Sequence, residues 1–330
     1  MSAGPLAVVT GASGFVGSHI VDELLRNDAR VRCILRPTSS TRWLDGKPVE
    51  ILRLEELDLD GLSAAVADAA WIVHAAGITQ ARSAKEFHEI NVGGTERVLR
   101  AAMASNGNLQ RFLYISSQAA GGPAADGRPV VESDRPDPAS TYGISKLRGE
   151  ELTMLLKNRM PVVSIRPPAV YGPRDKAFLR LYRMLKLHVM PVLRAGERFT
   201  LVYAEDLARA AYLALTHPRA PGEIYFVGEP ESTDSMEMGE CIRRSLGSPW
   251  ALTVRPPGFV LQTGALVAEL VGLATGSPPL LSREKLREIT AGDWLCSSAK
   301  IRSQLGWAPQ VGLEEGIART TAWYREAGWI

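Results

Sequence analysis

The residues best placed by type and spacing to do chemistry are a tyrosine and a lysine four positions apart, Tyr142 and Lys146. In a helix, residues at i and i+4 lie on one face, so the phenol and the ammonium would point the same way. A free tyrosine has a pKa near ~10, and a neighbouring cation favours the phenolate and lowers that value. The pair predicts a tyrosine that gives or takes a proton while hydride moves to or from carbon. A Tyr–Lys pair on an exposed helix face is the alternative, and the spacing alone does not separate the two.

A nearby pair of serines favours the catalytic interpretation of Tyr142 and Lys146. Ser116 and Ser117 follow the apolar run 111–115, which reads as a central strand. Parallel sheets bind ligands at the carboxyl ends of their strands. We therefore expect Ser117 to hydrogen-bond the substrate oxygen and steady its developing charge, with Ser116 facing the other way. Thr79 and Gln118 are the other predicted substrate contacts.

A glycine-rich turn, TGASGFVG at residues 10–17, follows the first apolar run and opens a helical pattern. Glycine lets the backbone turn tightly and approach a pyrophosphate, and the helix N-terminus offers free N–H groups to the phosphates. Its place between a strand and a helix separates it from a chance glycine turn. The predicted cofactor contacts in this turn are Gly11, Ser13, Gly14, Phe15, Val16 and Gly17.

The end of the second strand chooses between the two dinucleotides. An acidic residue there would bind the ribose 2′-hydroxyl of NAD, but this chain has Arg36 followed by hydroxyl residues that include Ser39. A guanidinium can clamp a 2′-phosphate, so we expect NADP(H) rather than NAD(H). A solvated surface arginine is the alternative.

Small residues end the fourth predicted strand. Ala75, Ala76 and Gly77 would let a ribose or nicotinamide lie against the backbone. We expect His74 beside them to be a buried, hydrogen-bonded histidine and not a catalyst. His88-Glu89 lacks the second histidine that a metal site needs, so no metal is predicted.

The elements that must position these residues alternate regularly. Short β-branched runs and helical patterns follow one another through residue 170, which predicts an α/β fold with a Rossmann-type, doubly wound parallel sheet. We expect residues 1–170 to bind the dinucleotide and residues 171–330 to form a smaller, mostly helical substrate region. Segments near 199–216 and 223–228 are expected to return to the first part, with residues 199–203 and 223–227 as strands of the main sheet. The predicted strands are 6–10, 31–35, 49–54, 71–75, 111–116 and 162–166, and the predicted helices are 15–26, 61–69, 87–104 and 142–157.

Taken together these motifs resemble the extended short-chain dehydrogenase/reductase family, within the NAD-dependent epimerase/dehydratase superfamily. The resemblance covers essentially the whole chain and is closest to the dihydroflavonol reductase and 3β-hydroxysteroid dehydrogenase-like members. It implies a triad of Ser117, Tyr142 and Lys146, with Asn91 supporting the lysine through water. It also implies that Tyr142 and Lys146 touch the cofactor, that Pro167 and Val170 meet the nicotinamide, and that the chain forms a homodimer through helices 87–104 and 142–157. The other segments that carry the resemblance are 91–95, 166–173, 202–208 and 296–305.

The family holds two chemistries, and three features favour one of them. Arg36 suits a reductase that releases NADP(H) each cycle. Phe199 occupies the position where nucleotide-sugar enzymes usually place an arginine for the diphosphate, with Arg198 one step away. The apolar segments Phe259–Thr275 and 278–281 resemble a lid over an apolar ligand, although a plain core helix is an equal alternative. We expect an enzyme that interconverts a ketone and a secondary alcohol; the alternative is a nucleotide-sugar epimerase or dehydratase. A non-catalytic NADP(H) sensor is disfavoured because Tyr142 and Lys146 are both present.

Composition excludes several other classes. The 330 residues carry a formal net charge of +2, and no basic stripe interleaved with aromatics predicts a nucleic-acid partner. The three cysteines are far apart and have no metal-ligand spacing, which is typical of buried thiols in a reducing cytosol. No signal peptide is evident, and the apolar segment 259–275 is interrupted and short of a membrane span. We expect a cytoplasmic enzyme with a small-molecule substrate; peripheral membrane contact stays open.

Overall fold

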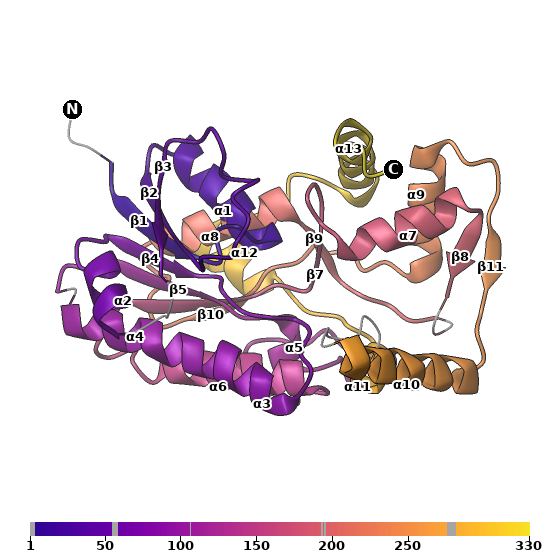
Figure 1. Cartoon of the computed structure of the whole chain (residues 1–330), viewed down its shortest axis with the longest axis horizontal. Coiled ribbons are helices and arrows are strands. Elements are labelled where there is room, and N and C mark those ends of the chain that lie inside the picture. Colours follow the sequence, from indigo (N-terminus) through magenta and orange to yellow (C-terminus); the bar gives the residue numbers. More distant parts are fainter. Residues whose placement is uncertain (1–3, 55–58, 106, 193, 195, 276–281) are drawn as a thin grey trace.

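The computed structural model describes residues 4–54, 59–105, 107–192, 194, 196–275 and 282–330. At its centre lies a seven-stranded sheet in the order β10-β6-β5-β4-β1-β2-β3, in which every neighbouring pair is parallel. The chain leaves β1 toward β3 and then returns to β4 and builds outward on the other side, so the strand order reverses between β1 and β4 (Figure 1). This confirms the predicted doubly wound sheet, which binds ligands at such a reversal. The strands are β1 (Leu6–Thr10), β2 (Arg30–Leu35), β3 (Val49–Arg53), β4 (Trp71–His74), β5 (Arg111–Ile115), β6 (Val162–Arg166) and β10 (Ile224–Phe226).

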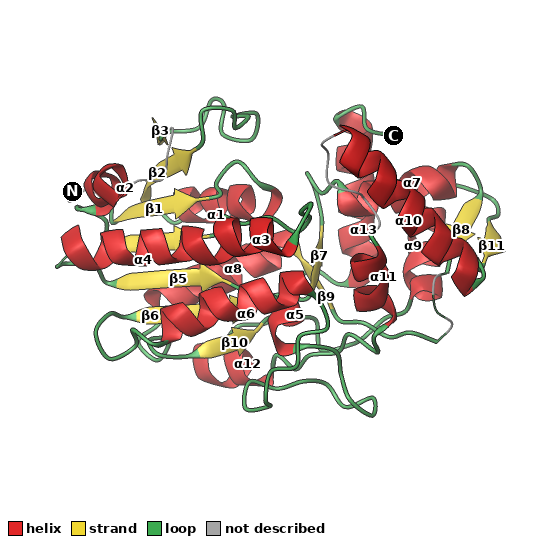
Figure 2. Cartoon of the chain, turned by 60° about the horizontal axis from the view of Figure 1, so that its bottom comes forward, coloured by secondary structure: helices red, strands yellow, loops and turns green. Residues whose placement is uncertain are grey.

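Helices cover both faces of this sheet. One face carries α1 (Phe15–Arg26), α8 (Ala204–Thr216) and α12 (Ala299–Leu305), and the other carries α2 (Leu59–Val66), α4 (Gly93–Ser105) and α6 (Thr141–Met154). Figure 2 shows α4 and α6 in front of the strands and α8 behind them. Alternate strand residues enter two separate cores: Val9 and Leu113 pack under α1 and α8, while Val8 and Phe112 pack under α2 and α4. Burial on both faces explains the near-continuous apolar strands of the sequence.

Two prolines divert the chain after β6. Pro167 and Pro168 lack the N–H groups that a ladder needs, and the chain beyond them leaves the main sheet as β7 (Ala169–Tyr171). This strand pairs in parallel with β9 (Leu201–Tyr203) in a sheet of its own. The expectation that residues 199–203 join the main sheet is therefore wrong. By contrast, β10 lies beside β6, and α8 packs against α1.

The later part of the chain builds a second, smaller core. It contains α7 (Ala177–Lys186), β8 (Val189–Pro191), α9 (Ser235–Leu246), β11 (Leu252–Val254) and α13 (Leu313–Glu326). Tyr182, Ile242 and Tyr324 are buried between these helices. Figure 1 shows α10 (Gly258–Thr275) and α11 (Arg283–Thr290) at the lower right edge of the molecule, with β11 running down to α10. Among the described helices, none is long and apolar enough to cross a bilayer.

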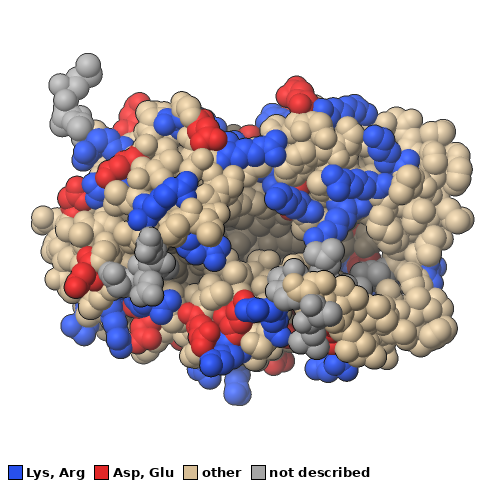
Figure 3. Space-filling model, in the orientation of Figure 1, with Lys and Arg blue, Asp and Glu red and all other residues tan. Residues whose placement is uncertain are grey.

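Aromatic and ionic contacts tie the smaller part to the sheet. The Trp43 ring lies 5.5 Å from that of Trp323, and Arg174 pairs with Asp22 of α1 at 2.7 Å. Between the two parts the surface is hollowed, as Figure 3 shows on one face of the molecule. The remaining short elements, α3 (Ala84–Phe87), a π-helical turn (His88–Val92) and α5 (Gln118–Gly121), lie on the sheet side of this hollow and position the site described next.

Candidate active site

The glycine turn packs directly against the end of β4. Gly11 has φ +74°, and a Cβ on it would lie 2.6 Å from the backbone of Ala75 and Ala76. A Cβ on Gly17 would lie 2.1 Å from the Gly11 carbonyl oxygen. Gly14 begins α1 without a side-chain cap, so the N–H groups of the first turn remain for an anion. The two segments predicted to hold the cofactor are thus neighbours, and they pack so closely that only glycine fits at position 11.

At the end of β2, two arginines meet at one turn. Arg36 is exposed, and Arg53 at the end of β3 donates from Nη1 to the carbonyl oxygens of Arg36 (3.2 Å), Pro37 (2.6 Å) and Ser39 (3.2 Å). The turn that presents Arg36 is therefore held by a second cation. Sequence reasoning missed Arg53, because its place depends on the register that pairs it with Leu35.

His74 is the buried, hydrogen-bonded histidine that the sequence predicted. The Thr10 hydroxyl donates to its Nδ1 at 2.7 Å, and its Nε2 donates to Thr95 at 3.0 Å, while the Thr95 hydroxyl donates to the Asn91 carbonyl oxygen at 2.6 Å. Burial lowers the pKa of His74 to about 3, with the Lys146 charge acting in the same direction. A neutral imidazole thus links the glycine turn to the helix that carries Asn91.

Asn91 lies in the π-helical turn and clamps the segment after β4. Its Oδ1 accepts from the Ile78 N–H at 2.8 Å, and its Nδ2 donates to the Ile78 carbonyl oxygen at 3.0 Å and to the Ser145 Oγ at 2.9 Å. π-turns frequently occur at functional sites because they shift a side chain out of the regular helical register. Here the direct partners of Asn91 are Ile78 and Ser145, so it fixes the loop over the site and the face of α6.

Tyr142 and Ser117 meet where α5 and α6 begin. The Ser117 Oγ caps α5 by accepting from the Ala119 N–H at 3.1 Å, and Ser140 caps α6. The Ser117 hydroxyl lies close enough to the Tyr142 phenol to lower its pKa. Burial raises the pKa of Tyr142 to about 12, the Ser117 hydroxyl offsets part of the rise, and the Glu288 charge adds to it.

Lys146 lies one turn further along α6 and is buried. Its Nζ donates to the Ile115 carbonyl oxygen at 2.6 Å and lies 4.4 Å from the centre of the Tyr114 ring. Burial lowers the pKa of Lys146 to about 7, although Glu150 opposes the shift. The expectation that Lys146 lowers the pKa of Tyr142 is therefore not met: burial dominates both groups and holds the phenol protonated at neutral pH.

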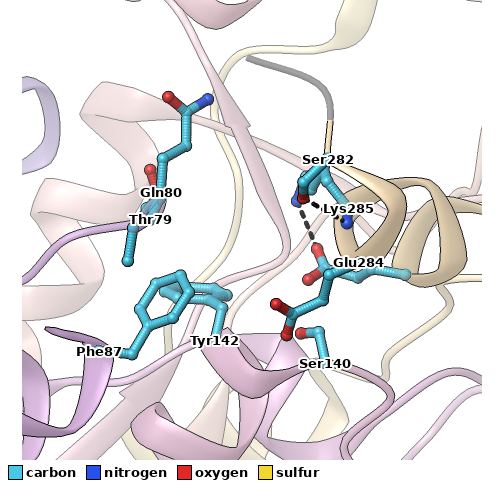
Figure 4. A pocket seen from close by; sticks show the side chains of 10 residues that line it. Thr79, Gln80, Phe87, Ser140, Tyr142, Ser282, Glu284 and Lys285 are labelled. Atoms are coloured by element: carbon cyan, nitrogen blue, oxygen red, sulfur yellow. Dashed lines mark hydrogen bonds and ion pairs between the residues drawn. The ribbon is translucent and has the colours of Figure 1, made fainter. Parts of the chain in front are cut away.

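A pocket opens beside Tyr142 (Figure 4). Thr79, Gln80 and Phe87 line one side, and the Phe87 and Tyr142 ring centres are 6.0 Å apart. The opposite side comes from α11 and the residue before it. Sequence reasoning missed this wall, because it comes from a segment about 140 residues away and carries no motif. Its residues are Ser282, Glu284, Lys285 and Glu288.

Three other predictions concern residues near the pocket. Gln118 is buried and does not line it, and its amide nitrogen has no hydrogen-bond partner among the described protein atoms. The backbone of Gln118 instead donates to the Pro167 carbonyl oxygen at 2.7 Å, which places Pro167 beside the end of β5. Val170 is partly buried in β7, two residues beyond the proline pair.

The apolar lid differs from expectation. Side chains of α10 do not line the pocket beside Tyr142; Leu261 and Gln262 line a neighbouring hollow, and most of the other apolar side chains of α10 are exposed. Residues 278–281, the rest of the predicted lid, lie outside the described residues. Within the described parts of the chain no His, Cys, Asp and Glu cluster suits a metal, and Cys33, Cys241 and Cys296 are free and buried.

Comparison with known proteins places these features in context. The model of the NAD-dependent epimerase/dehydratase family matches residues 7–228. Ceramide reductase of Caulobacter vibrioides is 29% identical, over 98% of this chain and 96% of the relative. The 3β-hydroxysteroid dehydrogenase/Δ5→4-isomerase of Mycobacterium tuberculosis is 27% identical, over 96% and 90%. The structure of UDP-glucuronic acid 4-epimerase from Bacillus cereus, in complex with UDP-glucuronic acid and NAD, shares the fold with a TM-score of 0.77 at 23% identity, over 98% and 99% of the two chains.

Proposed function

The chain belongs to the NAD-dependent epimerase/dehydratase family, and from that premise we propose that it is an NADP(H)-dependent oxidoreductase interconverting a ketone and a secondary alcohol on a small, mainly apolar substrate. One observation carries the proposal: Tyr142 borders the pocket, lies beside the Ser117 hydroxyl and is held protonated by burial. A protonated phenol can donate its proton to a ketone oxygen as hydride reaches the carbonyl carbon.

The residues at the end of the sheet fit a dinucleotide, whose nicotinamide supplies the hydride when bound. The glycine turn and the start of α1 would hold the pyrophosphate through the free N–H groups of the first helical turn. Gly11 lets this turn pack against the backbone of Ala75 and Ala76, where a Cβ would not fit. Arg36, on the turn held by Arg53, would bind the 2′-phosphate of NADP(H). Ala75 to Gly77, Pro167 and Val170 would contact the nicotinamide half of the cofactor.

Each polar residue of the site has a separate part in this scheme. Ser117 orients the substrate oxygen toward Tyr142, and Tyr142 transfers the proton. Lys146 lies near Gly77, where a Cβ would be 3.9 Å from its Nζ, and so reaches the place of the nicotinamide ribose. Asn91 is a positioning residue, since it touches Ile78 and Ser145.

Two features support an apolar ketone as the substrate class. Phe87 packs beside Tyr142 on the pocket wall. Phe199 occupies the position where nucleotide-sugar enzymes usually carry an arginine that binds the diphosphate. The names of two relatives, a ceramide reductase and a hydroxysteroid dehydrogenase, are those of enzymes for apolar molecules. The remaining candidate is a nucleotide-sugar epimerase or dehydratase, favoured by the polar wall of Glu284, Lys285 and Glu288, which suits sugar hydroxyls.

The first test measures cofactor oxidation. NADPH and NADH are offered with apolar ketones, β-keto acids, and UDP- and dTDP-sugars, with wild-type protein and Tyr142→Phe. We expect NADPH oxidation with an apolar ketone, and a loss of about 10²–10⁴-fold in kcat for Tyr142→Phe with little change in the KM for NADPH. Turnover of a nucleotide-sugar alone would overturn the substrate class, and a fully active Tyr142→Phe would overturn the mechanism.

We propose two further properties from the sequence. A homodimer would form through α4 and α6, with Met103 exposed on the outer face of α4. A cytoplasmic location would suit the three free thiols.

A further inference from the structure

One face of α10 is an exposed apolar stripe. Its six large side chains recur at helical spacing, so they form one band along the helix. Each is between 41% and 71% exposed, which is unusual for contiguous side chains of this kind and marks an interaction surface. The stripe consists of Phe259, Val260, Leu266, Val267, Leu270 and Val271.

The opposite face of α10 is anchored to the protein. Ala265 is fully buried, and Glu269 accepts from the Arg283 N–H at 2.8 Å and pairs with the Arg283 side chain at 2.9 Å. This contact fixes one face of α10 on α11. The stripe, on the opposite face, therefore points outward.

Two further large apolar side chains are exposed in and just before β11, the strand that precedes α10 in the chain. Trp250 and Leu252 are 58% and 62% exposed, and the chain passes from them into the first turn of α10. Figure 3 shows few charged side chains at the lower right of the molecule, where Figure 1 places α10. Tryptophan is enriched at surfaces that meet lipid headgroups.

Some charged side chains near the stripe have no ion-pair partner among the described residues, and these are basic. Arg255 and Arg287 are exposed and form no ion pair within the described parts of the chain. The acidic groups nearby are engaged: Glu269 pairs with Arg283, Glu288 pairs with Lys285, and Glu284 accepts from the Thr141 N–H. An apolar band with free arginines at its border complements an anionic lipid surface.

Three hollows that share lining residues lie between Tyr142 and the flank of α10. Ser140 and Glu284 line both the Tyr142 pocket and a second hollow beside Ile144. Arg283 and Arg287 line this second hollow and also a third, which reaches Leu261 and Gln262 of α10. The shared residues make the three hollows neighbours, which is the arrangement that a long molecule reaching Tyr142 from α10 would need.

We propose that the α10 stripe rests on the surface of an anionic phospholipid bilayer, and that a membrane-resident lipid ketone reaches Tyr142 along the hollows between α6, α10 and α11. The delivery step rests on the proposed reductase function, whereas the docking step does not. A bilayer is preferred to a second copy of the chain as the occupant, because the free charges at the border are of one sign and would repel their own copies across a twofold contact.

Flotation with lipid vesicles tests the docking step on the full-length protein. Vesicles of phosphatidylcholine mixed with phosphatidylglycerol are compared with phosphatidylcholine alone, at low and high salt. We expect wild-type protein to float with the anionic vesicles and the double variant Leu266→Glu/Leu270→Glu to bind at least about tenfold more weakly. Leu59→Glu, an exposed leucine on α2, is the matched control and should bind like wild type. Arg255→Gln/Arg287→Gln should weaken binding to anionic vesicles only, and salt should reproduce that loss.

Several results would overturn the docking step. They are absence of wild-type binding to anionic vesicles, unchanged binding by the stripe variant, and equal loss in Leu59→Glu. A fall in molecular mass in solution for the stripe variant, without wild-type flotation, would assign the stripe to a second copy. Melting temperatures of all variants should match wild type, because every substituted side chain is exposed.

An activity measurement tests the delivery step. NADPH oxidation with a short, water-soluble ketone should be the same for wild type and the stripe variant, whereas oxidation with a long-chain ketone held in anionic vesicles should fall about tenfold in the variant. Equal rates on vesicle-held ketone would contradict delivery along this path. Flotation without NADPH oxidation in the presence of any ketone would refute the reductase proposal and leave docking in place.

Discussion

At the active site, burial shifts the pKa values of Tyr142 and Lys146 in opposite directions, to about 12 and about 7. Spacing four residues apart in one helix is a local pattern, so the sequence could place the two side chains on one face. Their protonation could not be predicted that way. It depends on how much protein surrounds each group, and here desolvation outweighs the attraction between lysine and phenolate that the sequence suggested.

The lowered pKa of Lys146 makes the stability of the folded protein depend on pH. The folded-state pKa of about 7 lies below the ordinary 10.5 of the unfolded chain, so the unfolded state binds more protons between these values. Stability therefore rises with pH across this window and falls as pH drops toward 7. We expect Lys146→Met to stabilise the protein relative to wild type most at pH 7 and below, with the advantage shrinking by at most about 1.4 kcal/mol per pH unit toward pH 10. Urea unfolding at several pH values checks this; a pH-independent difference would contradict the burial of a charged amine.

Arg36 is the residue on which cofactor choice is proposed to depend. Arg36→Glu should raise the KM for NADPH about 10–100-fold while leaving that for NADH unchanged or lower, because a carboxylate repels a 2′-phosphate and accepts from a 2′-hydroxyl. Steady-state kinetics with both cofactors measure the ratio, and Arg30→Glu, on an exposed arginine at the start of β2, serves as the control. Equal effects on the two cofactors would leave Arg36 without a role in selection.

At the scale of elements, the glycine turn owes its function to its contact with β4. Gly11→Ala should abolish NADPH binding and cost more than about 2 kcal/mol, since the new Cβ meets the Ala75 backbone and φ is +74°. Gly247→Ala, at φ +73° with open space around it, isolates the conformational cost and should lose only about 1 kcal/mol with binding unchanged. Cofactor titration and chemical unfolding give the two quantities. Retained binding in Gly11→Ala would remove the turn from the cofactor site.

Helices and strands could be predicted where the pattern that identifies them is local. Their pairing and packing could not be predicted where these depend on a partner far away in the sequence. The strands of the main sheet could be recognised in the sequence as apolar runs, because both faces of the sheet are buried. The pairing of β7 with β9 was missed, since the two consecutive prolines, Pro167 and Pro168, remove β7 from the main ladder and leave β9 as its neighbour. Similarly, the amphipathic pattern of α11 shows a helix but not that Glu284 and Glu288 face Tyr142.

Considering the whole molecule, the second core and the placement of α10 decide what the site can accept. The apolar character of residues 259–275 was visible in the sequence, but only the ion pair of Glu269 with Arg283 shows which face is outward. The chemistry proposed for Tyr142 would serve a reductase and a nucleotide-sugar enzyme alike. We therefore propose that substrate choice depends on α10, α11 and the hollows between the two parts of the molecule, which local sequence patterns could not predict.

The most direct test of the central claim follows the hydride. NADPH carrying deuterium at the transferable C4 position is incubated with the protein and the substrate of highest turnover, and the product and cofactor are analysed by mass spectrometry. A reductase should leave one deuterium on the carbinol carbon of each alcohol formed, with one NADP⁺ released per alcohol, and Tyr142→Phe should lose this transfer by about 10²–10⁴-fold. Product formed from a nucleotide-sugar with no net consumption of NADPH would contradict the account.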